Sequence, residues 1–469
     1  MAEQNKPNIL FIMSDDHAAQ AMSCYGSDIN ETPNIDRIAE DGVRFDNCFC
    51  TNSICTPSRA TILTGKHSHK NGVLTLDSDF DRSQEHVGKL LRDAGYSTAV
   101  IGKWHLHTEP SGFDYYNVLP GQGKYHDPLL KEKGQEWQYR SKGGEEHKGY
   151  VTDIITDLSL EWLEEKAEND EPFFLMTHHK APHRPWDPDD RHADMYKDEE
   201  IPRPETFNDD YSNRAEAAEA AEMRIEEDLT RRDLKREPPD NLTGVELKNW
   251  KYQRYIKDYL RCVASIDDNV GRMLDYLDSK GLRENTIVIY TSDQGFFLGE
   301  HSWFDKRFMY EESLRMPLLV SYPREIEPGS VRDDIVLNLD FAETFLDYAG
   351  ERPPKDMQGR SLRPLFQGNE PEEWRQSMYY RYWMHLSDHG VYAHYGLRTR
   401  RYKLIYYYAD ALGVEGAIDD PREPEWELFD LKKDPLEINS VYDDPDYAEV
   451  VERLQDELKR AKEEAGDLR

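Results

Sequence analysis

The sequence has few cysteines and a deficit of positive charge. Five Cys occur in 469 residues, namely Cys24, Cys48, Cys50, Cys55 and Cys262. This small, odd number excludes a disulfide framework as the basis of the fold. Lys and Arg together number 59 against 93 Asp and Glu, so the net charge is −34. A chain this acidic is excluded as a general binder of nucleic acid or of anionic membranes.

Long apolar runs are absent as well. No stretch approaches the roughly 20 apolar residues that a membrane-spanning helix needs, and residues 1–7 lack the apolar segment of a signal peptide. We therefore expect no membrane span, and a cytoplasmic location for the chain as given, or a periplasmic or secreted one if a leader was removed. In contrast, 9 Trp, 28 Tyr and 16 Phe provide ample core material and exclude wholesale disorder.

Short apolar runs alternate with helix-like stretches over most of the chain. This pattern predicts an α/β domain over residues 1–370, with a large, mixed but mostly parallel sheet flanked by helices. The Ala-rich, charged stretch 216–236 predicts an exposed helix within this domain. The expected strands are 7–14, 98–101, 173–177, 286–290 and 318–322.

The pattern changes toward the C-terminus. Residues 378–383 and 402–406 are short, aromatic-rich segments typical of antiparallel strands. A final helix is predicted by apolar residues at helical spacing, namely Tyr447, Val450, Val451, Leu454 and Leu458. We therefore expect a smaller α+β domain over residues 371–469 that carries an antiparallel sheet.

Carboxylates follow two of the predicted strands. Asp15-Asp16 comes directly after strand 7–14, and Asp293-Gln294 follows strand 286–290. A single Asp pair is more often part of a turn than of a metal site. Two such strand ends in one α/β sheet favour a shared site, because ligands bind beyond the carboxyl ends of the strands. Oxygen ligands of this kind suit calcium or magnesium.

Between these two carboxylate pairs lies the segment Cys55-Thr-Pro-Ser-Arg59. A cysteine at a helix start can act as a nucleophile, with Arg59 holding an anion. Two other interpretations remain open: a cysteine buried in the core, or a zinc site built from Cys48, Cys50 and Cys55 with His67 or His69. The Cys spacing matches no standard zinc pattern.

The motif Cys-x-Pro-Ser-Arg-x4-Thr-Gly at 55–65 resembles the signature of type I sulfatases, in the alkaline-phosphatase superfamily. The resemblance extends over most of the chain and implies an alkaline-phosphatase-like fold. The other matching blocks are residues 7–16, 32–45, 102–106, 291–295, 305–311, 359–365 and 428–435.

The resemblance implies a cofactor set for this site. Cys55 would be oxidised to Cα-formylglycine by a formylglycine-generating or sulfatase-maturing enzyme. One calcium ion, rather than magnesium, would be held by Asp15, Asp16, residue 55, Asp293 and Gln294. The family more often has Asn or His at the last of these positions, but Gln also supplies a carbonyl oxygen.

The resemblance also implies the catalytic roles. One hydroxyl of the hydrated aldehyde at residue 55 would attack sulfur, and His105 would deprotonate the other hydroxyl to expel sulfate. Arg59 would orient the nucleophile. Lys103, Lys306 and His183 would bind the sulfate oxygens, and His183 or Lys306 would protonate the leaving oxygen.

The run 303–312 resembles bacterial carbohydrate sulfatases, especially the branch similar to N-acetylglucosamine-6-sulfatase. We therefore expect a sulfated carbohydrate as substrate, such as 6-O-sulfated N-acetylglucosamine. Candidate sugar contacts are Trp104, His107, Arg184, Arg381, Trp383 and His385, because aromatic faces and cationic groups suit sugars and their acids.

Three other functions remain open. One is a sulfatase for an algal polysaccharide such as ulvan, and another is a phosphonate or phosphate diester hydrolase of the same superfamily. The third is a sulfated-glycan-binding protein that has lost turnover. The presence of the elimination base His105 argues against the third, because a binding protein does not need it.

Overall fold

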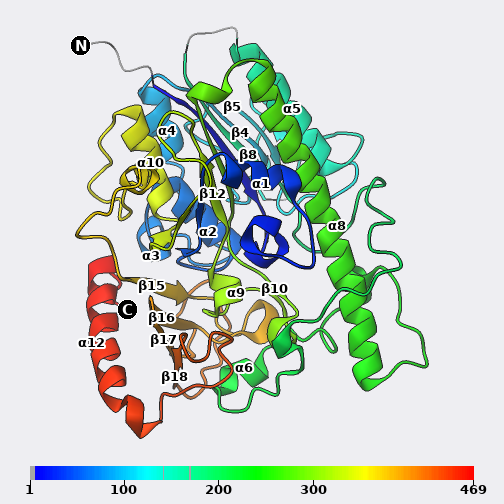
Figure 1. Cartoon of the computed structure of the whole chain (residues 1–469), viewed down its shortest axis with the longest axis vertical. Coiled ribbons are helices and arrows are strands. Elements are labelled where there is room, and N and C mark those ends of the chain that lie inside the picture. Colours follow the sequence, from blue (N-terminus) through cyan, green and yellow to red (C-terminus); the bar gives the residue numbers. More distant parts are fainter. Residues whose placement is uncertain (1–5, 141, 168–170) are drawn as a thin grey trace.

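The computed structural model describes residues 6–140, 142–167 and 171–469. It shows a large sheet between two layers of helices, with a smaller sheet and the C-terminal helix below them (Figure 1). This confirms the predicted mixed, mostly parallel sheet and the antiparallel C-terminal sheet. None of the helices in the described part of the chain is both long and apolar enough to cross a membrane.

In the described residues, ten strands form the large sheet in the order β13-β2-β12-β9-β1-β8-β4-β5-β6-β7. The five strands from β9 to β5 run parallel, and β12 runs antiparallel to β9. The bounds are β1 (Asn8–Ser14), β2 (Val43–Phe45), β4 (Ser97–Lys103), β5 (Tyr115–Leu119), β6 (Leu129–Glu132), β7 (Glu145–Glu146), β8 (Phe173–His178), β9 (Thr286–Ser292), β12 (Leu318–Ser321) and β13 (Ser330–Arg332).

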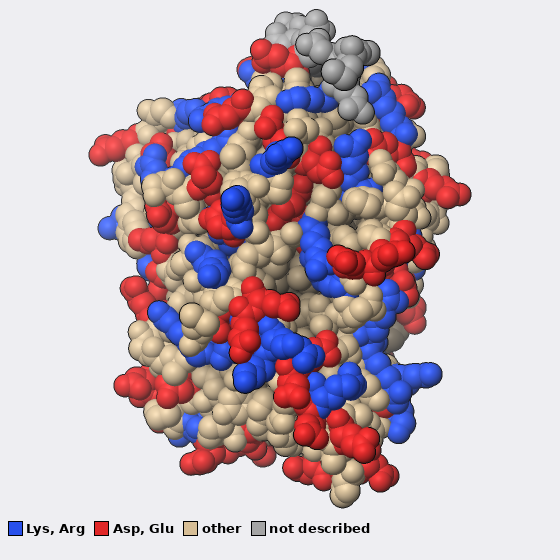
Figure 2. All heavy atoms as spheres, turned by 90° about the vertical axis from the view of Figure 1, so that its left-hand side faces the viewer, with Lys and Arg blue, Asp and Glu red and all other residues tan. Residues whose placement is uncertain are grey.

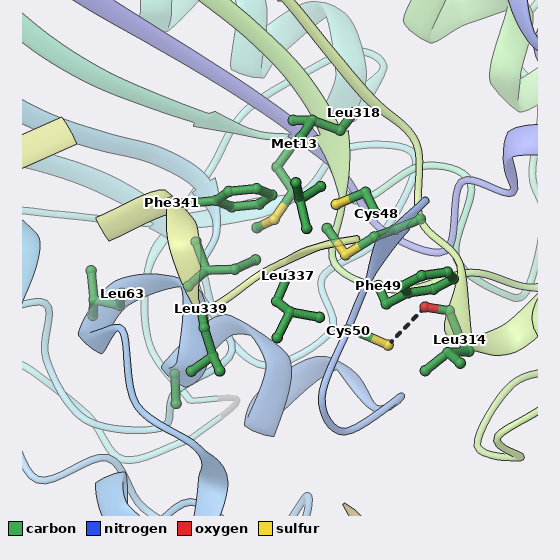
Figure 3. Close-up of a cluster of buried hydrophobic side chains, with 14 of the residues drawn as sticks. Met13, Cys48, Phe49, Cys50, Leu63, Leu314, Leu318, Leu337, Leu339 and Phe341 are labelled. Carbon is green, nitrogen blue, oxygen red and sulfur yellow. Dashed lines mark hydrogen bonds between the residues drawn. The ribbon is translucent and has the colours of Figure 1, made fainter. Parts of the chain in front are cut away.

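The sequence of the central strand β1 shows no alternation of polar and apolar residues, because both faces of the strand are buried. All seven of its residues are buried, as expected for a parallel strand covered on both faces. Phe11 and Met13 enter one hydrophobic core, whereas Leu10 and Ile12 enter the other. Figure 3 shows Met13 in the first core, together with Phe341 and Leu318.

The helices divide between the two faces of the sheet. Helices α1, α5 and α8 pack on one face, and α2, α4 and α10 lie on the other. The remaining helices are short or belong to the C-terminal part. The bounds are α1 (Pro33–Glu40), α2 (Cys55–Thr64), α3 (Ser68–Asn71), α4 (Val87–Asp93), α5 (Val151–Ala167), α6 (Glu216–Ala220), α7 (Arg231–Leu234), α8 (Gly244–Ser279), α9 (Glu311–Leu314), α10 (Asp340–Ala349), α11 (Arg363–Phe366) and α12 (Ala448–Ala465).

The smaller sheet consists of β15 (Ser377–Tyr382), β16 (His394–Thr399), β17 (Tyr402–Tyr407) and β18 (Glu425–Asp430), all antiparallel. Residues of β15 alternate between two cores: Tyr380 joins the core of the large domain, whereas Tyr379 packs with Leu454 and Leu458 of α12. One face of the small sheet is thus continuous with the large domain. The division into 1–370 and 371–469 stays a prediction.

The continuous helix predicted over 216–236 is wrong, because α6 ends at Ala220 and α7 begins only at Arg231. The intervening backbone bonds to another segment. Ile225 N donates to Ser302 O at 2.9 Å, and Phe304 N donates to Met223 O at 3.0 Å. These residues are also buried, so tertiary packing overrides the local helix propensity.

Four short strands form two separate pairs outside the large sheet. They are β3 (Cys48–Phe49), which pairs with β14 (Val336–Leu337), and β10 (Phe297–Leu298), which pairs with β11 (Phe304–Asp305). Cys48 and Cys50 lie in the apolar core, and the Cys50 thiol approaches Leu314 O (Figure 3). Among the described residues, neither belongs to a group with metal-ligand spacing, so the structure does not support the zinc interpretation.

Candidate active site

The site begins with three carboxylates at the ends of neighbouring strands. Asp15 and Asp16 follow β1, and Asp293 follows β9, whose Ser292 is in register with Ser14. Ligand atoms of the three carboxylates lie within 4.8 Å of one another, and all three residues are fully buried. Asp16 adopts a left-handed backbone (φ 66°) that aims its N–H at Asp293 Oδ1, 3.2 Å away. Three buried like charges at this spacing require positive charge close by.

Three cations of the chain supply part of that charge. Arg59 Nε donates to Asp293 Oδ2 at 3.0 Å, and Lys306 Nζ lies 2.7 Å from both oxygens of Asp16. Lys103 Nζ contacts Asp15 Oδ2. Burial nevertheless raises the pKa of Asp16 to about 6, although Lys306 opposes the shift. Each of the three carboxylates thus has one cation of the chain beside it.

The donor set fits a hard divalent cation. Two buried acceptor atoms of this cluster, Asp15 Oδ1 and Gln294 Oε1, have no hydrogen-bond partner among the residues that the structure describes. Together with the carboxylates of Asp16 and Asp293 they form a set of oxygen donors only, which is what calcium and magnesium prefer. Gln294 Nε2 donates to Asp16 Oδ1 at 2.5 Å, so the side-chain amide belongs to the same cluster.

Cys55 is the first residue of α2, a helix whose ten residues are all buried. Its sulfur lies within 4.8 Å of ligand atoms of Asp15 and His183. Burial raises the pKa of the thiol to about 11, with Lys306 opposing the shift. An unmodified Cys55 is therefore a protonated thiol at neutral pH and a weak nucleophile.

The end of β4 brings Lys103 and His105 to the same place. Arg59 Nη1 donates to Lys103 O at 2.7 Å, which ties α2 to this strand end. His105 Nδ1 lies 3.2 Å from the hydroxyl of Thr56, next to Cys55. Burial, and then the charge of Lys103, hold the pKa of His105 well below its usual value. His105 is thus a neutral imidazole that can accept a proton.

His183 comes from the loop after β8. Its Nε2 lies 3.8 Å from Asp16 Oδ2, and its Nδ1 lies 2.6 Å from Arg184 O. Burial, and then Lys103 and Lys306, hold the pKa of His183 well below its usual value. The structure thus brings together all the predicted catalytic and metal-site residues, around one strand-end crevice.

A cavity of about 380 Å³ opens onto Cys55, His183 and Lys306. Its wall is polar and carries both signs of charge, so it can offer charge-assisted hydrogen bonds to a polar ligand. The lining residues are Ile54, Cys55, Leu76, Gln122, Gly123, Lys180, His183, Arg184, Pro185, Arg232, Asp305, Lys306, Arg307, Asp388 and His389.

Of the six predicted sugar contacts, Arg184 lines this cavity and the other five do not. His107 and His385 bond to backbone oxygens of Leu76 and Asp420. Trp104 is buried in the core and donates to Thr108 O. Arg381 pairs with Asp467 and stacks on Trp383, which faces a different cavity. In each case a contact within the protein already holds the side chain.

Several residues that line this cavity are not among the residues predicted from the sequence. Lys103 Nζ donates to Gln122 Oε1 at 2.6 Å, and Gln122 lies in the loop after β5. Arg307 lies between Asp305, at 3.3 Å, and Asp388, at 3.8 Å. Arg307 and Asp305 flank the predicted Lys306, which was a usable signal. Gln122 and Asp388 carry no local signal, because distant chain segments bring them to the site.

Comparison with known proteins agrees with this geometry. The family model "Sulfatase" matches residues 7–351, and the model "N-sulphoglucosamine sulphohydrolase, C-terminal" matches residues 299–464. An N-acetylglucosamine-6-O-sulfatase of Bacteroides thetaiotaomicron is 44% identical, over 99% of this chain and 88% of that protein. An ulvan-active sulfatase of Formosa agariphila is 25% identical, over 99% of this chain and 83% of that protein.

A solved structure described as a complex with its substrate, D-glucosamine-2-N,6-O-disulfate, superposes on this chain with a TM-score of 0.92. It is 44% identical, and the match covers 99% of each chain. The resemblance seen in the sequence is thereby confirmed. The chain belongs to the sulfatase family, and it is a sulfuric ester hydrolase.

Proposed function

We propose that this sulfatase removes the 6-O-sulfate of a glucosamine residue in a sulfated carbohydrate. The observation that carries the proposal is the cavity itself: the sulfate-binding candidates His183 and Lys306 line it together with Cys55, and charged groups suited to a sugar line the rest. The 44% identical relatives, one named for N-acetylglucosamine 6-O-sulfate and one bound to a 6-O-sulfated glucosamine, support the same substrate class.

The proposal includes the cofactors that the site fits. A maturing enzyme would convert Cys55 to formylglycine, and Asp15, Asp16, Asp293, Gln294 and residue 55 would hold a calcium ion. The hydrated aldehyde would supply the nucleophilic hydroxyl that a protonated thiol lacks. The metal ion would bind the unpartnered oxygens Asp15 Oδ1 and Gln294 Oε1 and would add positive charge beside the nucleophile.

The chain's own residues then have distinct roles. Arg59, fixed by Asp293 and by Lys103 O, holds the nucleophilic side chain at the start of α2. Lys103 and Lys306 reach the oxygens of the sulfate group, where negative charge develops. Lys306 or His183 is proposed to protonate the leaving sugar oxygen. For His183 this requires that Nε2 first takes up a proton, because burial keeps the imidazole neutral and its Nδ1 already donates to Arg184 O. His105, neutral in the buried site, accepts the proton whose removal releases sulfate.

The sugar ring is proposed to bind against one group of charged residues in the cavity wall. Arg307, Asp305, Asp388 and His389 form a connected set there, with His389 Nε2 at 3.4 Å from Asp305. Paired carboxylates and guanidinium groups bind vicinal sugar hydroxyls through charge-assisted hydrogen bonds. Such contacts favour a monosaccharide or a chain terminus whose hydroxyls can enter the cavity.

The test is sulfate release by enzyme in which mass spectrometry confirms formylglycine at residue 55. The substrates are N-acetylglucosamine 6-sulfate, its 3-sulfate isomer, ulvan oligosaccharides, nitrophenyl sulfate and a phenyl phosphonate ester, with Cys55→Ala as the blank. We expect release from the 6-sulfate and not from the 3-sulfate. Release from ulvan alone, or faster cleavage of the phosphonate, would replace the proposal with the corresponding alternative.

A further inference from the structure

Two cations in the cavity differ from the others in having no acidic partner. Arg184 pairs with Asp233 at 2.9 Å, Lys306 with Asp16 at 2.7 Å, and Arg307 with Asp305 at 3.3 Å. For Lys180 and Arg232, which line the same cavity, no carboxylate oxygen lies within 4.0 Å among the residues that the structure describes. Arg232 is exposed, whereas Lys180 is buried.

Of the two cations, Lys180 gives the stronger indication of a bound anion, because its side chain is buried. The residue is 2% exposed, and its Nζ lies 4.7 Å from the centre of the Tyr125 ring. Burial lowers the pKa of Lys180 to about 8. An ammonium group taken out of water without an ion-pair partner is costly, so an anionic group of a ligand beside Lys180 would offset that cost.

The backbone fixes Lys180 beside the reaction centre. His183 N donates to Lys180 O at 3.1 Å, and Asp15 N donates to the next carbonyl, Ala181 O, at 3.1 Å. The turn 180–183 therefore presents Lys180 and His183 to the same cavity. Arg232 is brought to the rim by α7, whose Asp233 holds Arg184 through two hydrogen bonds, of 3.1 Å and 2.9 Å.

The inner carboxylates do not need these two cations. Asp15, Asp16 and Asp293 are each in contact with a cation of their own, Lys103, Lys306 and Arg59 respectively. Lys180 and Arg232 line the cavity and take no part in these three ion pairs, so their charge is available to a group that enters with the substrate.

We propose that Lys180 and Arg232 form a second anion-binding subsite, which holds an anionic group of the substrate other than the sulfate ester that is cleaved. The inference rests on the proposed function. The chemistry it names is a sulfated amine on the same sugar ring or the carboxylate of a neighbouring uronic acid. Either group would make the substrate doubly anionic, and the subsite would select for it over a singly charged analogue.

The experiment compares three substrates in the formylglycine-containing enzyme: glucosamine 2-N,6-O-disulfate, N-acetylglucosamine 6-sulfate, and a disaccharide of a uronic acid with N-acetylglucosamine 6-sulfate. The variants are Lys180→Met, Lys180→Arg and Arg232→Met, with Lys124→Met as the control, since Lys124 is an exposed lysine on the adjacent loop. Thermal unfolding confirms that each variant is folded.

We expect Lys180→Met and Arg232→Met each to lower kcat/KM about tenfold, chiefly through KM, for a doubly anionic substrate. The loss for N-acetylglucosamine 6-sulfate should stay below about twofold, Lys180→Arg should restore part of the activity, and Lys124→Met should change nothing. A loss on the disulfate assigns the subsite to the sulfated amine, and a loss on the disaccharide assigns it to the carboxylate.

Two results would overturn the inference. Equal losses on all three substrates would mean that Lys180 contacts the reacting sulfate, and no loss on any of them would mean that neither cation binds substrate. If the wild-type enzyme releases sulfate from none of the three, the proposed function fails. Calorimetric binding of the disulfate to wild type and Lys180→Met then tests the subsite independently, with equal affinities refuting it.

Discussion

At the scale of single residues, the hydrogen bond from Lys103 to Gln122 determines how the Gln122 amide is oriented. An ammonium group can only donate, so the amide oxygen faces Lys103 at 2.6 Å. The amide nitrogen then points away from Lys103, along a wall of the cavity. Gln122 thus offers a donor next to the residues that are proposed to bind sulfate.

Because of this orientation, the two nearly isosteric substitutions Gln122→Glu and Gln122→Met should lower kcat/KM to different extents. Gln122→Glu keeps an acceptor for Lys103 but replaces the donor with negative charge, which repels the sulfate ester. Gln122→Met removes both groups without adding charge. We expect kcat/KM for the sulfate ester to fall about 100-fold in Gln122→Glu and about tenfold in Gln122→Met.

Steady-state kinetics show which of the two variants has the lower kcat/KM, and their Tm values show whether each is folded. If Gln122 only positions Lys103, Gln122→Glu will instead be the more active of the two, because its carboxylate still accepts from the ammonium group.

Cys55 gives a second prediction at this scale. Cys55→Ala should reduce sulfate release to the background rate, because no nucleophile remains at the start of α2. The fold should persist, since alanine is a good helix former and the deleted atom is small, so the Tm should shift by only a few degrees. Sulfate assays and thermal unfolding of the same sample measure both. Retained turnover in folded protein would refute the assignment of Cys55.

The inner site was predictable residue by residue because its members carry local signals. Asp15 and Asp293 end apolar strands, and Cys55 lies within a specific motif. The cavity wall was not predictable in this way. Gln122 and Asp388 can be assigned to the site only from their contacts in the fold. Gln122 contacts Lys103, and Asp388 contacts Arg307, which is distant in the sequence.

At the scale of elements, strand β1 was predicted to within one residue, because burial on both faces leaves an unmistakable apolar run. The stretch 216–236 shows the opposite case. Its composition favours a helix, but the pairing of Met223 and Ile225 with residues 302–304 uses the backbone groups that a helix would need. Such a competition between local and tertiary hydrogen bonds is decided by partners that are distant in the chain.

The contact between α2 and α10 leads to a prediction about pH. Glu343 of α10 accepts a hydrogen bond from Gly359 N at 2.6 Å, and its other oxygen lies against Gly65 at the end of α2. Burial, and then Asp340, raise the pKa of Glu343 to about 8. In the unfolded chain the carboxyl ionises near its ordinary value of 4.5.

Between these two values Glu343 binds fewer protons in the unfolded state than in the folded state, so its contribution to the free energy of unfolding falls as pH rises from about 4.5 to 8. Glu343→Gln keeps the acceptor and removes the ionisation. We expect the variant to match the wild type near pH 4 and to be about 3 kcal/mol more stable at pH 8–9.

Urea unfolding across this pH range measures the difference between the two proteins. Two curves that stay parallel from pH 4 to pH 9 would mean that Glu343 ionises normally in the folded state.

At the scale of the whole molecule, the excess of Asp and Glu over Lys and Arg opposes the binding of an anionic substrate. Figure 2 shows Lys and Arg interspersed with Asp and Glu over one face of the protein, so neighbouring charges offset one another there. The net charge is still −34. Binding of a sulfate ester then depends on cations gathered in the cavity, where low exposure protects them from screening.

The excess of negative charge also predicts how salt affects the stability of the protein. Repulsion among excess carboxylates acts over many ångströms and is screened by salt, whereas close ion pairs on the surface contribute little each. Repulsion should therefore dominate, and raising NaCl from 0.02 to 0.3 M should raise the Tm by several degrees. Glucose at equal osmolality is the control for effects other than screening. A Tm that falls with NaCl would mean that local ion pairs, rather than the net charge, govern the stability of this acidic sulfatase.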